Sequence, residues 1–130
     1  MDIRENMFYG FGKVALAIAL ADGKVDHTEV QFIEESIKNI DKKNHIDLTL
    51  VRIVFNDYLK RGTSFTAAEI LQNGIEEFHL GDNHLTHELA GIFSEVLKGL
   101  VAADNHHTIE EDEALVKFLT YLAERERIKA

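Results

Sequence analysis

Hydrophobic positions recur along the chain with the spacing of α-helices. In residues 85–103 they fall three or four positions apart, at Leu85, Leu89, Ile92, Phe93, Val96 and Leu100. This spacing places them on one face of a helix. The strict alternation of apolar and polar residues that is typical of β-strands persists nowhere in the sequence. The pattern therefore predicts an all-α fold.

The starts of helices are marked by capping boxes, in which a short polar side chain caps the first turn and a glutamate three residues later binds the cap's backbone N–H. Three segments fit: Asp26-x-x-Glu29, Thr66-x-x-Glu69 and Thr108-x-x-Glu111. Gly62 and Gly81 follow periodic runs, as expected of a residue with positive φ after a helix. These signals predict a compact bundle of about six main helices over residues 2–21, 27–41, 48–61, 67–80, 84–103 and 109–126.

The packing of this bundle is also predicted in part. The first and fifth helices are the most apolar on all sides, so we expect them at the buried centre with the others around them. Gly74 lies inside the fourth helix, where glycine costs roughly 1 kcal/mol relative to alanine, and indicates a close helix crossing. The 130 residues and 45% apolar content fit a single domain, 1–130.

Residues 15–29 align without a gap onto residues 97–111. Each copy is an apolar helix that ends in Ala-Asp, followed by a residue tolerant of positive φ (Gly23 or Asn105), a short loop and a capped helix. The chain therefore contains an internal repeat, which predicts two pseudo-symmetric helix–loop–helix units.

The two loops resemble the TerB-like (tellurite-resistance TerB) superfamily. The resemblance rests on Ala19-Leu20-Ala21-Asp22-Gly23-Lys24-Val25-Asp26-x-x-Glu29 and on its second copy, Ala103-Asp104-Asn105 to Glu111. It implies a compact helical fold over nearly the whole chain, a cytoplasmic protein of stress or tellurite-resistance systems, metal-binding acidic loop residues and a membrane-protein partner. The second copy departs from the pattern at Asn105, Thr108 and His106-His107, so the loops are not equivalent metal sites.

Two interpretations of the acidic loops stay open. Capping alone accounts for Asp26, Glu29 and Glu111. Asp22 and Asp104 instead end apolar helices, where exposed carbonyls already make the field negative, so that a bound cation would relieve repulsion. Carboxylate and carbonyl oxygens suit Ca²⁺, Mg²⁺ or Mn²⁺. The candidate metal ligands are Asp22, Asp26, Glu29, Asp104 and Glu111; the alternative is that the aspartates are solvated and coordinate nothing.

Seven histidines raise a second metal hypothesis. His84 and His87 share a helix face, and His79 lies across the Gly81 turn, so these three form at most a partial transition-metal site. The alternative is that the histidines are exposed and titrate near neutral pH.

Composition narrows the classes of function. Cysteine is absent, which excludes disulfides, thiolate catalysis and cysteine-type zinc sites. The net charge of −9 opposes binding to nucleic acid or to an anionic membrane surface. No apolar run is long enough to span a bilayer and the first residues do not read as a signal peptide, so we expect a cytoplasmic protein without membrane insertion.

No nucleophile elbow or phosphate-binding loop occurs, and the sequence therefore favours a protein that is not an enzyme. Our leading hypothesis is a stress-response or interaction module that binds a divalent cation at the acidic loops. The alternatives are a purely structural or protein–protein interaction domain without metal and, more weakly, a metal-dependent hydrolase. Phe8, Tyr9 and Phe11 would serve a protein partner if exposed, but we expect them in the core.

Overall fold

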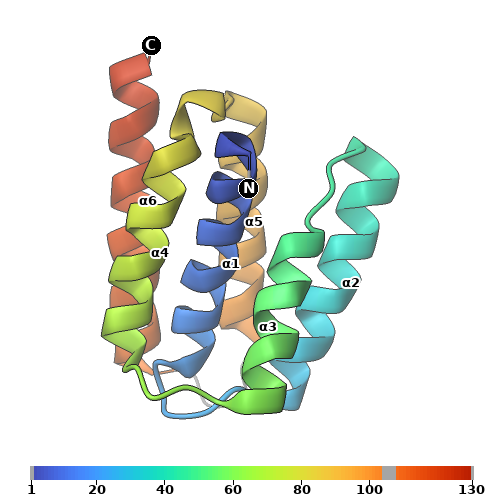
Figure 1. Cartoon of the computed structure of the whole chain (residues 1–130), viewed down its shortest axis with the longest axis vertical. Helices are drawn as coiled ribbons and strands as arrows, with labels where there is room; N and C mark the ends of the chain where they lie inside the picture. Colours follow the sequence, from blue (N-terminus) through green and yellow to red (C-terminus); the bar gives the residue numbers. More distant parts are fainter. Residues whose placement is uncertain (1, 104–107, 130) are drawn as a thin grey trace.

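In the computed structural model, which describes residues 2–103 and 108–129, the chain is all-helical. Successive α-helices run up and down the bundle, so that the α1–α2 and α3–α4 connections, the end of α5 and the start of α6 lie at one end (Figure 1). The all-α prediction is confirmed. Within the described ranges the elements are α1 (Ile3–Leu20), α2 (His27–Asn44), α3 (Thr49–Arg61), α4 (Ala67–Gly81), the 3₁₀ turn η1 (Asp82–His84), α5 (His87–Ala103) and α6 (Ile109–Lys129).

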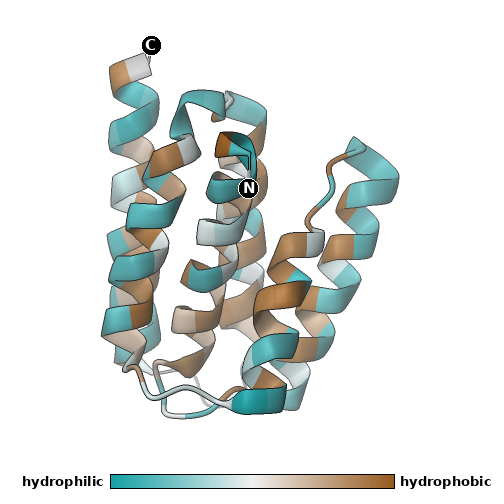
Figure 2. Cartoon of the chain, in the orientation of Figure 1, coloured by the Kyte–Doolittle hydropathy of each residue, from teal (hydrophilic) through white to brown (hydrophobic). Residues whose placement is uncertain are grey.

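Helix α1 occupies the centre of the bundle. It contacts α3, α4, α5 and α6, and every residue from Val14 to Leu20 is buried. The lower half of α1 is accordingly coloured as apolar in Figure 2. The prediction of a central helix is therefore correct for α1 but wrong for α5, which buries one face and exposes Glu95 and Lys98 on the other. Charged residues recur at helical spacing along α5 and form a solvent-exposed face. The high apolar content of the helix did not indicate this face.

An aromatic cluster joins the helices around α1. The ring centroids of Phe11 and Phe93 lie 4.3 Å apart in a stacked arrangement, and those of Phe78 and Phe118 lie 5.2 Å apart at right angles. Both geometries are favourable for aromatic pairs beyond the area they bury. Because the four rings come from α1, α5, α4 and α6, the cluster fixes how these helices pack.

The α1–α4 crossing depends on glycine. A Cβ atom on Gly10 would lie 2.3 Å from the backbone nitrogen of Phe78 and 2.6 Å from the carbonyl oxygen of Gly74. A Cβ on Gly74 would lie 3.0 Å from the carbonyl oxygen of Gly10. The close crossing predicted from Gly74 is confirmed, and it brings the two backbones into direct contact.

The two predicted helix-end glycines differ. Gly62 has φ +67°, as predicted, whereas Gly81 has φ −113° and is the last residue of α4. The prediction of a positive φ at Gly81 is wrong. Glycine is needed there for a different reason: a Cβ would lie 2.2 Å from the carbonyl oxygen of Ile3, so Gly81 extends the close contact between α1 and α4.

Two predicted boundaries shift. Helix α2 continues past residue 41 to Asn44 and ends at His45, whose φ of +57° is left-handed. The predicted helix 84–103 divides into η1 and α5, because the Thr86 hydroxyl accepts a hydrogen bond from the backbone nitrogen of Leu89 and caps a new helix.

Candidate functional site

The first acidic loop connects α1 to α2. Helix α1 ends with Ala21 as its C-cap, and Gly23 has φ +106°, with its nitrogen bonded to the carbonyl oxygen of Leu20 at 2.8 Å. Asp22 lies beyond the cap and not in the last turn of α1, as we had placed it. Its Oδ1 accepts a hydrogen bond from the backbone nitrogen of Lys24 at 3.2 Å, which holds the turn closed.

The second half of this loop is the first capping box. Asp26 Oδ1 accepts hydrogen bonds from the backbone nitrogen and the hydroxyl of Thr28, both at 2.9 Å. The backbone nitrogen of Asp26 donates in turn to Glu29 Oε1 at 2.8 Å. The capping box predicted from Asp26-x-x-Glu29 is therefore confirmed.

The second copy is built in the same way at its helix start. The backbone nitrogen of Thr108 donates to Glu111 Oε1 at 3.1 Å, and the nitrogen of Glu111 donates to the Thr108 hydroxyl at 3.3 Å. This capping box is also confirmed. Asp104, Asn105, His106 and His107 lie outside the described residues, so the pseudo-symmetry of the two units stays a prediction.

The three capping boxes differ in whether their glutamate is buried. Thr66 and Glu69 make the same pair of hydrogen bonds, at 2.8 and 3.1 Å, yet Glu69 is exposed. The side chains of Glu29 and Glu111 are fully buried. Capping therefore does not require the glutamate to be buried. The two repeat copies share a buried glutamate, whereas the glutamate of the third capping box is exposed.

The first acidic loop, the end of α5 and the start of α6 lie at the same end of the bundle (Figure 1). The Thr28 hydroxyl oxygen lies 2.9 Å from the carbonyl oxygen of Ala103 and equally far from Asp26 Oδ1, so its single proton is shared between these two acceptors. Through this contact the first loop is held against the last residue of α5, directly before the second loop. We call this region the loop end.

The loop end does not display a complete metal site among the residues described. Over residues 2–103 and 108–129, no three His, Asp or Glu side chains are grouped so that they could hold an ion. Asp22, Asp26 and Glu29 are thus close in sequence without forming such a group by themselves. Asp104, the fifth candidate ligand, lies outside the described ranges.

The histidines near Gly81 have separate partners. His79 Nδ1 lies 2.9 Å from Asp82 Oδ2, whereas His87 Nδ1 lies 2.8 Å from Glu126 Oε2 at an exposed position. In the part of the chain that the structure describes, His79, His84 and His87 do not form a group of three that could hold a metal ion.

Asp82 is a buried charge that sequence reasoning missed. Its Oδ2 accepts a hydrogen bond from the Tyr121 hydroxyl at 2.7 Å and lies 2.9 Å from Arg125 Nε. Burial by itself raises the pKa of Asp82, but the hydrogen bonds from Tyr121 and His79, with the charge of Arg125, lower it below its ordinary value. Burial and the neighbouring carboxylate raise the pKa of Tyr121. This network ties η1 to α6, and no sequence pattern distinguishes Asp82 from an exposed turn aspartate.

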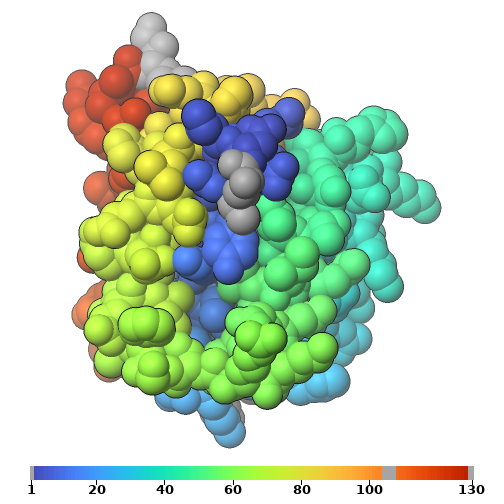
Figure 3. Space-filling view, in the orientation of Figure 1, coloured from blue at the N-terminus to red at the C-terminus, as the bar shows by residue number. Residues whose placement is uncertain are grey.

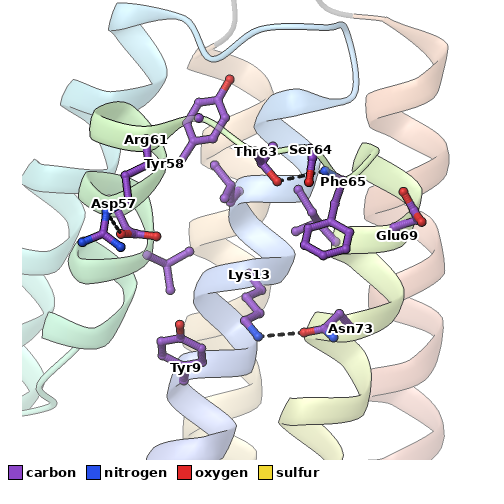
Figure 4. A pocket seen from close by; sticks show the side chains of 14 residues that line it. Tyr9, Lys13, Asp57, Tyr58, Arg61, Thr63, Ser64, Phe65, Glu69 and Asn73 are labelled. Carbon is purple, nitrogen blue, oxygen red and sulfur yellow. Dashed lines mark hydrogen bonds and ion pairs between the residues drawn. The ribbon is translucent and has the colours of Figure 1, made fainter.

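A groove of about 1010 Å³ runs between α1, α3 and α4. In the space-filling view α1 is visible along it between the two flanking helices (Figure 3). Its lining includes Tyr9 from α1, Tyr58 from α3 and Phe65 from the α3–α4 loop (Figure 4). Of the three residues singled out for a partner surface, Phe8 and Phe11 are buried in the core, as expected, and Tyr9 lines this α1/α3/α4 groove.

Comparisons with known proteins give no family for this chain. No helix among the described residues combines the length and the hydropathy needed to cross a membrane. No protein-family model, curated protein or solved structure matches the chain.

Proposed function

We propose that this chain is a non-enzymatic, TerB-like module that binds a hard divalent cation at the loop end. The observation that carries the proposal is the burial of two glutamates, Glu29 and Glu111, at equivalent places in the repeat and at one end of the bundle. The resemblance of the loops to the TerB-like superfamily supports a cytoplasmic role in stress response or tellurite resistance, with a membrane protein as partner.

Burial of these carboxylates has an electrostatic cost. Removing an ion from water costs several kcal/mol even after the protein relaxes. The N-termini of α2 and α6 and the hydrogen bonds to Oε1 of each glutamate offset part of this cost. Glu69 accepts the same kind of hydrogen bond at the N-terminus of α4, although its side chain is exposed. The loop end therefore buries two glutamate side chains although capping alone requires no burial, in a chain whose net charge is −9.

A divalent cation is the ligand that this arrangement favours. Carboxylate and carbonyl oxygens are hard donors, which select Ca²⁺, Mg²⁺ or Mn²⁺ over softer metals. The chain provides such oxygens at Asp22, Asp26, Glu29 and Glu111, and Asp104 adds a further carboxylate to the second loop.

The second candidate function is a structural or protein–protein interaction domain without metal. It is favoured by the capping hydrogen bonds, which use Asp26 and one oxygen of each buried glutamate. A metal-dependent hydrolase would need the same cation with an open coordination position, and it is the weakest of the three hypotheses.

The experiment is a calorimetric titration of metal-stripped protein with Ca²⁺, Mg²⁺ and Mn²⁺. We expect saturable binding by the unmodified chain and a loss of affinity of about 10- to 100-fold in Asp22→Ala and in Glu29→Gln. Glu69→Gln is the matched control, because it removes one carboxylate from the capping box of α4, which belongs to neither acidic loop. We expect it to bind the cation like the unmodified chain.

Thermal unfolding gives an independent measure. At a cation concentration 100 times its Kd, binding to the folded state adds about 2.7 kcal/mol to the free energy of unfolding. We expect Asp22→Ala to lack this increase. Flat titrations with all three cations, or an equal loss of affinity in Glu69→Gln, would contradict the proposal and leave the loop end as helix capping.

A further inference from the structure

His79 is a surface histidine that a buried carboxylate holds in place. It lies in the last turn of α4, and its Nδ1 is 2.9 Å from Oδ2 of Asp82 in the following turn, η1. The side chain of Asp82 is 3% exposed, whereas that of His79 is 58% exposed. The pair lies at the end of the bundle opposite the loop end (Figure 1). One ring nitrogen is therefore fixed by the protein while the ring stays open to solvent.

The hydrogen between these two atoms belongs to the histidine. Although burial raises the pKa of Asp82, the hydrogen bonds from Tyr121 and His79 and the charge of Arg125 lower it below its ordinary value. Asp82 is thus a carboxylate and can only accept, so Nδ1 of neutral His79 carries the hydrogen and Nε2 carries the lone pair. Among the described residues, no group forms a hydrogen bond or an ion pair with Nε2. The lone pair is available as a nucleophile.

The surroundings of His79 favour a positive charge on its ring. A histidine that attacks an electrophile through Nε2 keeps its Nδ1 hydrogen and becomes a cation. Asp82 lies beside that hydrogen, and the C-terminus of α4 adds negative potential. In a Ser-His-Asp triad, a buried aspartate in the same place fixes the tautomer and stabilises the imidazolium. Asp82 is positioned to do both for His79.

An arginine adjoins this pair. Arg125 Nε lies 2.9 Å from Asp82 Oδ2, which is the oxygen that His79 also contacts, and Arg125 Nη2 lies 3.3 Å from Asp82 Oδ1. These two nitrogens face Asp82, and the N–H groups of Nη1 remain. The side chain is 23% exposed. Because guanidinium donors match the oxygens of a phosphoryl group, Arg125 favours phosphoryl transfer to Nε2 over transfer of an uncharged acyl group.

His87 provides a comparison within the same chain. Its Nδ1 lies 2.8 Å from Glu126 Oε2, so it has the same kind of partner. Its side chain is 98% exposed, however, and the side chain of Glu126 is 35% exposed. In the described part of the chain no lysine or arginine pairs with Glu126. The other described histidines contact no carboxylate: His27, His45 and His84. The buried carboxylate and the arginine distinguish His79.

We propose that Nε2 of His79 accepts a phosphoryl group from a phosphoramidate, which is either a small molecule or a phosphohistidine of another protein. The Nε2 lone pair forms the new N–P bond. The donor's N–P bond breaks, and its electron pair leaves with the protonated donor nitrogen as a neutral amine or imidazole. The Nδ1 hydrogen stays on the ring of His79, whose positive charge Asp82 balances.

The donor class follows from the chemistry of the site. Phosphorus is the only electrophilic centre of a phosphoramidate, whereas an acyl phosphate also offers a carbonyl carbon to the imidazole. Phosphoryl transfer depends mainly on positioning and on charge stabilisation, which Asp82 and Arg125 supply. The reaction uses residues away from the loop end and requires no cation, so it is independent of the proposed cation site.

The test treats the unmodified chain with potassium phosphoramidate in the presence of a chelator. Peptide mass spectrometry locates the phosphoryl group, and its loss in mild acid identifies an N–P bond. We expect His79 to react about tenfold faster than His87, because its carboxylate is buried. Exposure alone predicts the opposite order, since His87 is the more exposed of the two.

Two variants separate the carboxylate from the stability of the network. Asp82→Asn should slow the reaction of His79 by about tenfold and leave that of His87 unchanged. Tyr121→Phe is the matched control, because it removes a hydrogen bond from the same network and keeps the carboxylate. It should leave the ratio of the two rates unchanged. Circular dichroism verifies that both variants are folded, and NMR of the ring nitrogens should place the hydrogen of His79 on Nδ1 in the unmodified chain.

The dependence of the rate on phosphoramidate concentration distinguishes the two sources. Saturation at His79 assigns a small phosphoramidate as the donor. A rate that stays proportional to concentration assigns a phosphohistidine of another protein, whose own surface provides the binding. Reaction of His87 as fast as that of His79 would overturn the proposal. So would an unchanged rate at His79 in folded Asp82→Asn, or a hydrogen found on Nε2 of neutral His79.

Discussion

Replacing Gly10 by alanine tests whether the α1–α4 contact holds the bundle together. The new Cβ would lie 2.3 Å from the backbone nitrogen of Phe78, whereas ordinary contacts begin at 3.4 Å. The overlap of about 1.1 Å is with backbone, which no rotamer change relieves. The two helices must therefore move apart by about 1 Å, a gap that forfeits a quarter to a half of each van der Waals contact.

The expected loss follows from two opposing effects. Alanine favours the helix over glycine by roughly 1 kcal/mol, and overpacking of a tight core costs about 1–3 kcal/mol or more. Because this overlap is large and involves backbone, we place the overpacking near the top of that range or above it. We expect a net loss of roughly 2–3 kcal/mol in the free energy of unfolding. For a domain of this size the melting temperature should fall by about 10 °C.

Gly91→Ala is the matched comparison. Gly91 lies inside α5, and nothing lies within 4 Å of the Cβ that alanine would add. The same chemical change should here stabilise the chain by about 0.5–1 kcal/mol. The two variants are compared by urea and thermal unfolding monitored by circular dichroism. Equal stabilities, or a loss in Gly91→Ala as large as that in Gly10→Ala, would refute the close-packing argument.

Two further predictions concern the buried carboxylate of Asp82 and the N-cap residues Asp26 and Thr66. Because the folded pKa of Asp82 is depressed, its charge contributes stability above the unfolded pKa of about 3.9, and this contribution is lost as pH falls through the folded pKa. Asp82→Asn should therefore lower the midpoint of urea unfolding at pH 7 more than at pH 2. Asp57→Asn, on the exposed face of α3, is the control. An equal decrease of the midpoint at both pH values in Asp82→Asn would count against the network. With chelator present, Asp26→Ala and Thr66→Ala should each destabilise by roughly 0.5–2 kcal/mol as lost caps, and an unchanged melting temperature would contradict that role.

Local sequence rules predicted the helices and their starts well. The capping boxes at Asp26, Thr66 and Thr108 formed because their hydrogen bonds join residues three apart, so the sequence itself contains both partners. Gly74 was also informative, because a glycine inside a helix has a cost that a close contact offsets, although Gly91 shows that not every such glycine makes one.

Features that depend on distant residues escaped prediction. Gly81 looked like a helix-ending glycine, but its requirement comes from Ile3, which is distant in sequence and starts α1 beside the end of α4. Burial of Asp82 depends on Tyr121 and Arg125, about forty residues away. The acidic loops were found by their repeat, yet nothing local indicated that Glu29 and Glu111 would be buried when Glu69 is not.

The central position of α1 has a consequence for folding. Its partners α3, α4, α5 and α6 all begin at Thr49 or later, and α2, the next helix along the chain, is not among its main contacts. Helix α1, which is buried from Val14 to Leu20, therefore stays uncovered until α3 and the later helices have formed. Such long-range pairing slows folding and leaves time for association between chains. A chaperone that binds aliphatic segments would meet this protein at residues 14–20.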